Sequence, residues 1–347
     1  MRLDQILIRS NNNFELLRLI ASISVIYYHG FFLFSKEGFV DFISQNLKYD
    51  DLGPLAVKFF FFISGLCVCN SLLEGNNVRT YLVSRFFRIM PAYFFVLVFC
   101  GFFIGPIVTS LKFDEYFTNF DTYDYVLSNL LFITKFSLPG VFDNNPFPSG
   151  INGSLWTIAY EVGAYLGLLS LFMIGIHRYK WISLLTFILI MMDLTQGFKF
   201  IFSWRVVDPS IDYLIASFAF GSILAVFKKE VDINFNVVIG ILLLYFLLFK
   251  SRQAELIFYA LIFLLLLLIS IQPWFLKLRP TNDLSFGIYL WGFPIQQLII
   301  YFFPEINLYF YLLISILLSI FVAFLSWFFV EKKAISYGKK YSVRFLD

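Results

Sequence analysis

A histidine and an arginine share one face of the first long apolar segment of the chain. Arg18 and His29 are eleven residues apart, which corresponds to three helical turns and roughly 17 Å of rise. Eleven steps of about 100° return to within about 20° of the starting direction, so both side chains face the same way. Each such group costs on the order of 3 kcal/mol at the centre of a bilayer. We therefore expect protein or water to shelter them and interpret the pair as part of a functional site.

A carboxylate from another apolar segment is expected at the depth of His29. Glu161 lies about seven residues from the outer end of the fourth segment, and at 1.5 Å per residue both groups come roughly 10 Å below the outer surface. Pairing would raise the basicity of the imidazole towards that of a general base. Ser154 and Thr157 share the face of Glu161 at helical spacing. A structural reading stays open, with Glu161 as the partner of an arginine or of Lys58, a residue that could instead snorkel to the outer interface.

Three arginines are expected at the same depth near the inner surface of the membrane. Arg18 lies level with Arg85 and Arg88, and a planar guanidinium binds phosphate oxygens in pairs. Such a cluster of positive charge at the inner surface, with a base three helical turns deeper, suits a donor that has a nucleotide at one end and a long flexible chain, such as acyl-coenzyme A. Arg85 and Arg88 could alternatively be charges that only set the membrane topology.

The elements that position these residues are apolar helices. The chain is 60% apolar and 14% charged, with a mean hydropathy of +0.80, which is far outside the range of soluble domains. The apolar runs are continuous, whereas the strands of a membrane β-barrel would alternate. The sequence predicts an all-α polytopic membrane protein, with one domain over 1–347 and about ten spans. These are expected at about 14–34, 54–73, 89–110, 154–174, 181–197, 210–227, 235–249, 254–271, 284–303 and 308–330.

The distribution of basic residues predicts that both termini are cytoplasmic. With that orientation the inner segments hold sixteen of the 26 Lys and Arg residues and the outer segments hold eight, while Arg18 and Lys58 lie within spans. This bias follows the positive-inside rule. It also accounts for the net charge of +3, so we expect no nucleic-acid partner. The first apolar run shows no signal-peptide cleavage pattern, and with three cysteines and two histidines no metal site is expected.

Five short motifs follow one another in the order in which a known family carries them. They are Phe14–Ala21 with His29, similar to a basic-residue-x10-His signature; Phe59–Gly65, similar to Phe-Ile-Ser-Gly; Arg85–Pro91, similar to Arg-x-x-Arg-x-x-Pro; Ser154–Glu161, similar to Leu-Trp-Ser-Leu-x-x-Glu; and Ser285–Trp291, similar to Ser-x-Gly-Ile-Tyr-Leu-Trp. Over nearly its whole length the chain thus resembles the acyltransferase 3 family of bacterial integral-membrane O-acyltransferases, which modify surface saccharides.

The resemblance implies acetyl transfer from cytoplasmic acetyl-coenzyme A to a hydroxyl of a surface saccharide at the bacterial inner membrane. The first expectation for the acceptor is the lipopolysaccharide O-antigen or its lipid-linked precursor. Arg18, Arg85 and Arg88 would then hold the donor phosphates. Ser64 and Gly65 would bring the backbone close to the donor arm.

The same resemblance gives the reacting groups their roles. His29 is expected to act as the general base on the saccharide hydroxyl or to be transiently acetylated, and the sequence leaves both routes open. Glu161 would orient His29 and stabilise its charge, as the third member of a triad does. The candidates for acceptor binding or support are Lys58, Ser154, Trp156 and Tyr289.

Two features depart from the pattern of the family. Many members carry His-x-Pro after the last motif, whereas here Gly292 precedes Phe293 and Pro294. Some members also carry a fused extracytoplasmic hydrolase-like domain, and we expect none here, which implies direct transfer to the acceptor or transfer through a separate protein.

Two other function classes also fit a multispan protein that handles polysaccharide. A flippase or exporter of lipid-linked sugars would carry charges in its spans, although the chain shows no repeated halves with paired interrupted helices. A polysaccharide polymerase would also be rich in Phe and Tyr. Consumption of coenzyme A thioester distinguishes the transferase from the flippase, and a change in chain length identifies the polymerase.

Overall fold

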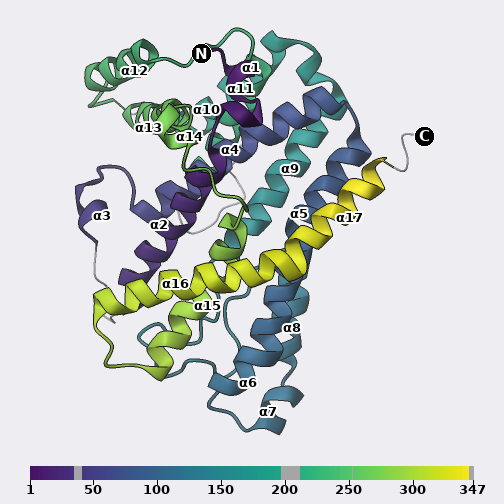
Figure 1. Cartoon of the computed structure of the whole chain (residues 1–347), viewed down its shortest axis with the longest axis vertical. Helices are drawn as coiled ribbons and strands as arrows, with labels where there is room; N and C mark the ends of the chain where they lie inside the picture. The colour runs from purple at the N-terminus through teal and green to yellow at the C-terminus, as the bar shows by residue number, and fades with distance from the viewer. Residues whose placement is uncertain (35–40, 197–211, 252, 344–347) are drawn as a thin grey trace. The chain divides into compact units, whose positions relative to one another are not determined.

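The computed structural model describes residues 1–34, 41–196, 212–251 and 253–343 (Figure 1). Within them the chain forms helices and isolated bridges but no β-strand, which confirms the all-helical class. Its elements are α1 (Leu3–Ile6), η1 (Arg9–Asn11), α2 (Phe14–Phe34), α3 (Phe42–Asn46), α4 (Leu52–Gly75), α5 (Val78–Phe99), η2 (Cys100–Ile104), α6 (Gly105–Val108), α7 (Phe113–Thr118), α8 (Phe120–Leu130), α9 (Trp156–Ile174), η3 (Ile176–Arg178), α10 (Lys180–Gln196), α11 (Asp212–Val226), α12 (Phe235–Leu247), α13 (Ala254–Ser270), α14 (Pro273–Leu276), α15 (Ser285–Phe302), α16 (Leu308–Ser326), η5 (Trp327–Glu331) and α17 (Lys332–Val343).

A helix lies in each of the ten predicted ranges, but these helices differ in their fitness to cross a membrane. Among the described residues, five helical segments are long and apolar enough: Phe14–Phe34, Leu52–Gly75, Val78–Val108, Trp156–Ile174 and Leu308–Ser342. The chain is therefore a multi-pass membrane protein, while the count of ten spans and the orientation stay predictions. Some positions used for those predictions lie outside the described residues: 197, 210 and 211 in two spans, and Lys36, Lys199, Arg205, Arg252 and Arg344 in the charge count.

Helix α5 begins at Val78, whereas the predicted span begins at 89. The Asn77 side chain accepts a hydrogen bond of 2.9 Å from the Thr80 backbone N–H and so satisfies one of the unpaired donors of the first turn. Arg85 and Arg88 consequently lie on a helix and not in a connecting loop. The same helix continues through the π-helical segment η2 into α6.

The chain divides into two compact units, each described by itself. Unit 1 comprises Met1–Ala21, Pro54–Asn76 and Gly163–Thr281, and unit 2 comprises Ser22–Gly53, Asn77–Val162 and Asn282–Asp347. In unit 1 the helices α4 and α11 cross at two glycines. A Cβ on Gly65 would lie 2.0 Å from the carbonyl oxygen of Phe218, and one on Gly221 would lie 2.1 Å from that of Phe62. Small residues let the backbones of membrane helices approach closely in this way.

Helix α15 forms the core of unit 2. It packs along α16, while α5 packs along α17 (Figure 1). Nearly every residue of α15 is buried, including Gln296 and Gln297, which are both 0% exposed. Protein surrounds this helix, so its residues do not need the lipid-facing apolar character of a span. This explains why α15 is not among the five segments that meet the hydropathy criterion, although it occupies the predicted range 284–303.

Candidate functional site

Helix α2 carries both Arg18 and His29 without interruption, as their predicted common face requires. The half-buried His29 ring meets the ring of Phe293 edge-on, with centroids 5.4 Å apart and planes at 80°. Tyr28 lies against it on the same helix, with centroids 5.8 Å apart. Within the described part of the chain, neither ring nitrogen of His29 makes a hydrogen bond. The imidazole is thus held in place by ring contacts.

Glu161 lies on the first turns of α9 beside two hydroxyl groups of unit 2. Thr157, one turn earlier on the same face, forms a hydrogen bond of 2.7 Å with the phenol of Tyr289, and Glu161 lies within electrostatic range of that phenol. The side chain of Ser154 is buried, and its backbone N–H donates to Asn152 at 3.1 Å. The structure therefore brings Glu161 and Tyr289 together. A hydrogen bond between Glu161 and His29 is not formed among the described residues, and their pairing stays a prediction.

Trp156 opens α9 in the same unit and is half-buried. Its ring packs edge-on against Tyr160, with centroids 5.8 Å apart. The loop before it is fixed by Asn152, whose side chain donates to the Leu290 carbonyl at 2.9 Å. Trp156 therefore lies in the first turn of α9 and packs against Tyr160 of the next turn. Its part in acceptor binding stays a prediction.

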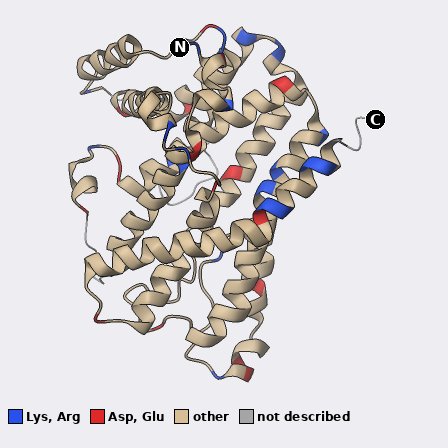
Figure 2. Ribbon diagram, viewed as in Figure 1, with Lys and Arg blue, Asp and Glu red and all other residues tan. Residues whose placement is uncertain are grey.

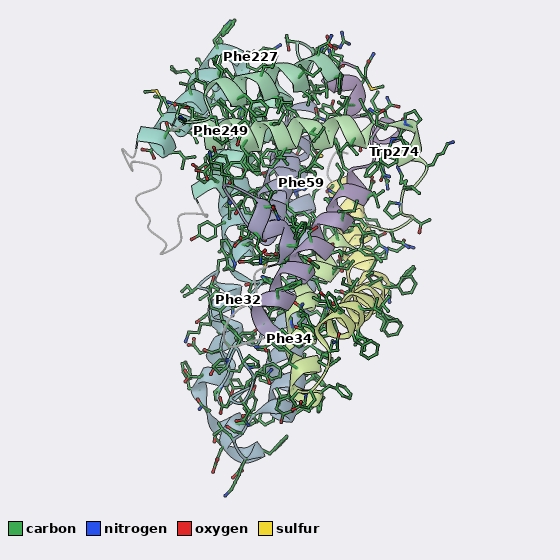
Figure 3. All side chains as sticks on the ribbon, turned by 90° about the vertical axis from the view of Figure 1, so that its left-hand side faces the viewer. Phe32, Phe34, Phe59, Phe227, Phe249 and Trp274 are labelled. Carbon is green, nitrogen blue, oxygen red and sulfur yellow. The ribbon has the colours of Figure 1, made fainter. Side chains whose placement is uncertain are left out.

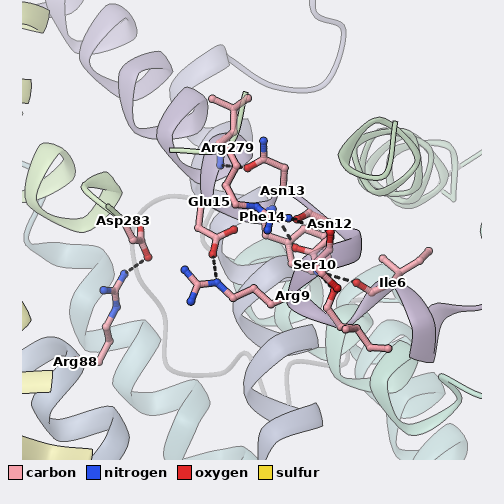
Figure 4. A network of polar contacts seen from close by, with 12 residues as sticks. Ile6, Arg9, Ser10, Asn12, Asn13, Phe14, Glu15, Arg88, Arg279 and Asp283 are labelled. Atoms are coloured by element: carbon pink, nitrogen blue, oxygen red, sulfur yellow. Dashed lines mark hydrogen bonds and ion pairs between the residues drawn. The ribbon is translucent and has the colours of Figure 1, made fainter. Parts of the chain in front are cut away.

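Arg88 forms an ion pair that the sequence reasoning did not anticipate. Its guanidinium donates to the carboxylate of Asp283 at 2.8 Å (Figure 4), and its carbon lies 5.8 Å from the centroid of Phe286. Ser285 holds the other carboxylate oxygen of Asp283 at 2.7 Å. A phosphate that binds Arg88 would therefore meet a guanidinium that is already oriented and partly neutralised.

Basic side chains gather on two neighbouring helices of unit 2. Helices α5 and α17 pack side by side, and blue segments mark their Lys and Arg residues in Figure 2. These residues are Arg79, Arg85 and Arg88 on α5 and Lys332, Lys333, Lys339 and Lys340 on α17. We call this set the basic face. It provides the positive charge that a polyphosphate ligand requires.

The other predicted donor residues lie in unit 1. The hydroxyl of Ser64 forms a hydrogen bond of 2.7 Å with that of Tyr165. The space beside Gly65 is taken by the Phe218 carbonyl. Arg18 is half-buried, one turn after Glu15, which accepts a hydrogen bond of 2.9 Å from Arg9 (Figure 4). The close approach of Gly65 is therefore to helix α11, and donor binding by Ser64 and Gly65 stays a prediction.

Lys58 is only 1% exposed, so it does not snorkel to an interface. Its ammonium lies 5.1 Å from the ring centroid of Tyr259 and 5.8 Å from that of Tyr213. Both phenols donate to Glu255, at 2.7 Å from Tyr213 and 3.3 Å from Tyr259. Lys58 thus lies beside a buried polar cluster, and its part in acceptor binding or support stays a prediction.

A cavity of about 250 Å³ in unit 1 adjoins the same tyrosines. Its lining is almost entirely apolar and includes Phe187, Phe220 and Phe263. The hydroxyl of Ser217, also in the lining, donates to the Tyr213 carbonyl at 2.6 Å. This cavity offers no charge for the phosphates of a donor.

Polar residues inside apolar helices were the signal that the sequence reasoning left unused. Glu255, Gln296 and Gln297 lie within predicted spans and were not singled out, although ionisable and polar groups at such positions point to a site or a buried network. Asp283 gave no such signal because it lies in the short connection before α15. Only the fold brings it to Arg88.

An ion pair and a histidine outside the spans have shifted pKa values. The hydrogen bond from Lys135 is the main cause that lowers the pKa of the Asp124 carboxyl, with Ser128 contributing, and Asp124 in turn raises the pKa of Lys135. Burial lowers the pKa of His177, whose Nδ1 lies 3.3 Å from the Ser183 hydroxyl. This burial and the contact with Ser183 agree with a structural role for His177 in the turn before α10.

Known proteins are similar to this chain over almost its whole length. Residues 11–330 match the family model of an acyltransferase domain, the acyltransferase 3 family. The chain is 24% identical over 339 residues to an O-acetyl transferase of Shigella phage Sf6, which covers 94% of this chain and 96% of that protein. It is also 24% identical to the peptidoglycan O-acetyltransferase OatA of Listeria monocytogenes, over 81% of this chain and 49% of that protein.

A third relative is matched over less of its length. Nodulation protein 10 of Rhizobium leguminosarum is 28% identical over 169 residues, which is 45% of this chain and 43% of that protein. No solved structure matches the chain. The family match extends from before α2 into η5 and so includes His29, Glu161 and Arg88. The chain therefore belongs to the acyltransferase 3 family and is an acyltransferase.

Proposed function

We propose that the protein transfers an acetyl group from acetyl-coenzyme A to a hydroxyl of a surface saccharide at the bacterial inner membrane. The names of two relatives, an O-acetyl transferase and a peptidoglycan O-acetyltransferase, support O-acetylation of a polysaccharide. The acceptor proposed first is the lipopolysaccharide O-antigen or its lipid-linked precursor. The observation that carries the proposal is the His29 imidazole, fixed by ring contacts on α2 with no hydrogen bond to its nitrogens within the described residues.

His29 is the proposed general base. It takes the proton of the saccharide hydroxyl while the hydroxyl oxygen forms a bond to the carbonyl carbon of the thioester. The carbon–sulfur bond then breaks, and the imidazolium returns the proton to the departing thiolate. The products are an acetyl ester and coenzyme A thiol, so protons and charge balance. Glu161 would stabilise the imidazolium by its negative charge.

The donor phosphates are assigned to arginines. Arg85 and Arg88 belong to the basic face of α5 and α17, and Arg18 lies eleven residues before His29 on α2. With both termini in the cytoplasm, the basic face would meet cytoplasmic acetyl-coenzyme A, and excess positive charge on that side follows the usual rule for membrane proteins. A reporter domain fused to the C-terminus should therefore be accessible only from the cytoplasm.

The experiment that tests the function measures base-labile acetate on surface polysaccharide. A deletion strain would carry either the wild-type gene or His29→Ala, at matched abundance in the membrane. We expect acetate with the wild type and a loss of about 10²–10⁴-fold in transfer rate with His29→Ala, the usual contribution of a general base. Normal acetate with a well-folded His29→Ala protein would remove His29 from the chemistry. Absence of acetate with the wild type would contradict the proposed function and favour the flippase or polymerase.

Transient acetylation of His29 is the alternative to direct transfer, and trapping of the acetylated protein distinguishes the two routes. If a His29 nitrogen attacks the thioester first, then incubation with acetyl-coenzyme A and no saccharide should leave an acetyl group on His29. Mass spectrometry of the peptide that contains His29 would detect it. Direct general-base transfer predicts an unmodified peptide.

A further inference from the structure

Four aromatic rings form a continuous chain that begins at His29 and returns to its own helix. Phe293 meets His29 edge-on at 5.4 Å, Phe147 meets Phe293 edge-on at 6.0 Å, and Phe32 lies 5.3 Å from Phe147 between ring centroids. Phe32 is three residues after His29 on α2, so both lie on neighbouring turns of one helix face. Phe147 comes from the loop between α8 and α9. The rings therefore form a continuous row beside the proposed base.

The loop that carries Phe147 is held rigidly. The Gln297 side chain donates to the carbonyl oxygens of Phe147 and Gly150, both at 2.8 Å, and Asn145 donates to the Gln297 side-chain oxygen at 2.9 Å. Gln297 and Asn145 are 0% and 4% exposed. Buried amide bonds of this kind are costly to break, so the position of the Phe147 ring is fixed before any ligand binds.

Glycines allow this close approach of the rings. A Cβ on Gly150 would lie 2.5 Å from the Phe147 ring, and one on Gly153 would lie 2.4 Å from the ring of Phe293. The backbone of the loop is thus in contact with both rings, where a larger residue would push them apart. The arrangement depends on the residues of this loop and not on general apolar packing.

Part of the ring chain remains accessible. Phe32 is 46% exposed on α2 (Figure 3), and Phe147 is half-buried beside the exposed loop residues Asp143 and Asn144. An aromatic surface next to polar loop groups suits a ligand with an apolar face and a polar edge. A pyranose ring has this character, since its C–H groups lie on its faces and its hydroxyls project from its edge. Aromatic ring faces carry partial negative charge and attract such C–H groups.

We propose that Phe147 and Phe32 form an acceptor subsite that binds the face of a pyranose ring beside His29. The proposal rests on the proposed function and deepens it, because it assigns the saccharide to named residues. Gln297 is then a positioning residue, which holds Phe147 at the subsite. Binding at this place would bring a hydroxyl on the edge of the sugar towards the imidazole.

The test uses the purified full-length protein in nanodiscs and oligosaccharide released from the polysaccharide of the deletion strain. Saccharide binding is measured by calorimetry without donor, and acetyl transfer is measured as KM for saccharide and for acetyl-coenzyme A separately. Phe147→Leu and Phe32→Leu remove a ring, whereas Phe147→Tyr keeps it. Phe321→Leu is the matched control, since Phe321 is also an exposed phenylalanine of unit 2, at 58%.

We expect Phe147→Leu to weaken saccharide binding and to raise KM for saccharide about tenfold, which equals about 1.4 kcal/mol, with KM for acetyl-coenzyme A unchanged. Phe32→Leu should act in the same direction, while Phe147→Tyr and Phe321→Leu should resemble the wild type. Gln297→Leu should repeat the saccharide defect. Unchanged saccharide binding in Phe147→Leu, or a rise in the KM of the donor alone, would overturn the proposal.

The binding measurement separates this inference from the proposed function. Ring-dependent saccharide binding without acetyl transfer would keep the subsite and contradict the transferase activity. Acetyl transfer with a KM for saccharide that is unchanged in Phe147→Leu and Phe32→Leu would keep the activity and contradict the subsite. Thermal unfolding of each variant shows whether it is folded. If Phe147→Leu is not folded, Phe32→Leu still tests the loss of a ring, with Phe147→Tyr as the variant that keeps both rings.

Discussion

Gly292 of α15 lies directly against Ile26 of α2: a Cβ on Gly292 would come within 2.7 Å of Cγ1 and 3.1 Å of Cδ1 of Ile26. Ile26 is 1% exposed and lies one turn before His29. The contact leaves no room for a side chain at position 292 unless Ile26 moves. The neighbouring Phe293 ring lies against His29.

Substitution of Gly292 should therefore destabilise unit 2 through this one contact. We expect Gly292→Ala to lower stability by about 1–3 kcal/mol, the usual effect of an overpacked core, and Gly292→His to be worse. Ile26→Ala should be destabilising alone because it leaves a cavity, yet the double variant should lose less than the sum of the two. Thermal unfolding in detergent measures all three. Gly163→Ala is the control, since no atom lies within 4 Å of its Cβ position, and strictly additive effects would contradict the contact.

Gly65→Ala should have a larger effect than Gly292→Ala. Its Cβ would lie 2.0 Å from a backbone carbonyl oxygen, which cannot move away as the end of a side chain can. We expect the abundance of folded protein to fall severalfold, and Gly221→Ala to do the same from the other helix. Gly240→Ala, with open space at its Cβ position inside a helix, should not lower the abundance, because alanine is the better helix former. The alternative role of Gly65, contact with the donor, predicts normal abundance and a raised KM for acetyl-coenzyme A.

The ion pair between Arg88 and Asp283 predicts opposite effects of its two partners on donor binding. Arg88→Gln should raise KM for acetyl-coenzyme A about tenfold, because hydrogen bonds to charged groups contribute about 1.5–3 kcal/mol. Asp283→Asn should lower that KM, since it removes the carboxylate that competes with phosphate for the guanidinium. Steady-state kinetics at two salt concentrations measures both, with Lys112→Gln in an exposed loop as the control. Equal KM values in all the variants would make the ion pair a purely structural contact.

The Asp124–Lys135 ion pair should make the segment after α8 sensitive to acid. The folded pKa of Asp124 is lowered below its ordinary 3.8 mainly by the hydrogen bond from Lys135. A carboxyl with a lowered folded pKa contributes its stabilisation above its unfolded pKa and loses it as the pH falls through the folded value. We therefore expect the hydrogen-exchange protection factors of residues 131–135, which compare the observed rate with that of an unfolded chain at the same pH, to be steady above pH 5 and to fall below about pH 4. Lys135→Met should remove this dependence, and persistence of the acid effect in that variant would assign it to another carboxylate.

The sequence by itself determined the class of the protein and proposed which side chains react. Continuous apolar runs can satisfy their backbone hydrogen bonds in a membrane only as helices, so the helical class followed from composition and periodicity. The spacing of Arg18 and His29 determined their common face, because both lie on one helix and local geometry suffices. The order of the motifs indicated the family, which the match over residues 11–330 confirms.

What the sequence could not determine are the contacts between residues distant in the chain. Asp283 and Arg88, Gln297 and Phe147, and Phe293 and His29 are each brought together only when helices pack. No periodicity along one segment encodes such a pair, since it depends on which faces of two helices meet. The use of α15 as a largely buried core also required the fold, because polar residues in an apolar helix predict burial but not their partners. The tertiary structure alone thus decided which side chains surround the imidazole that the sequence identified.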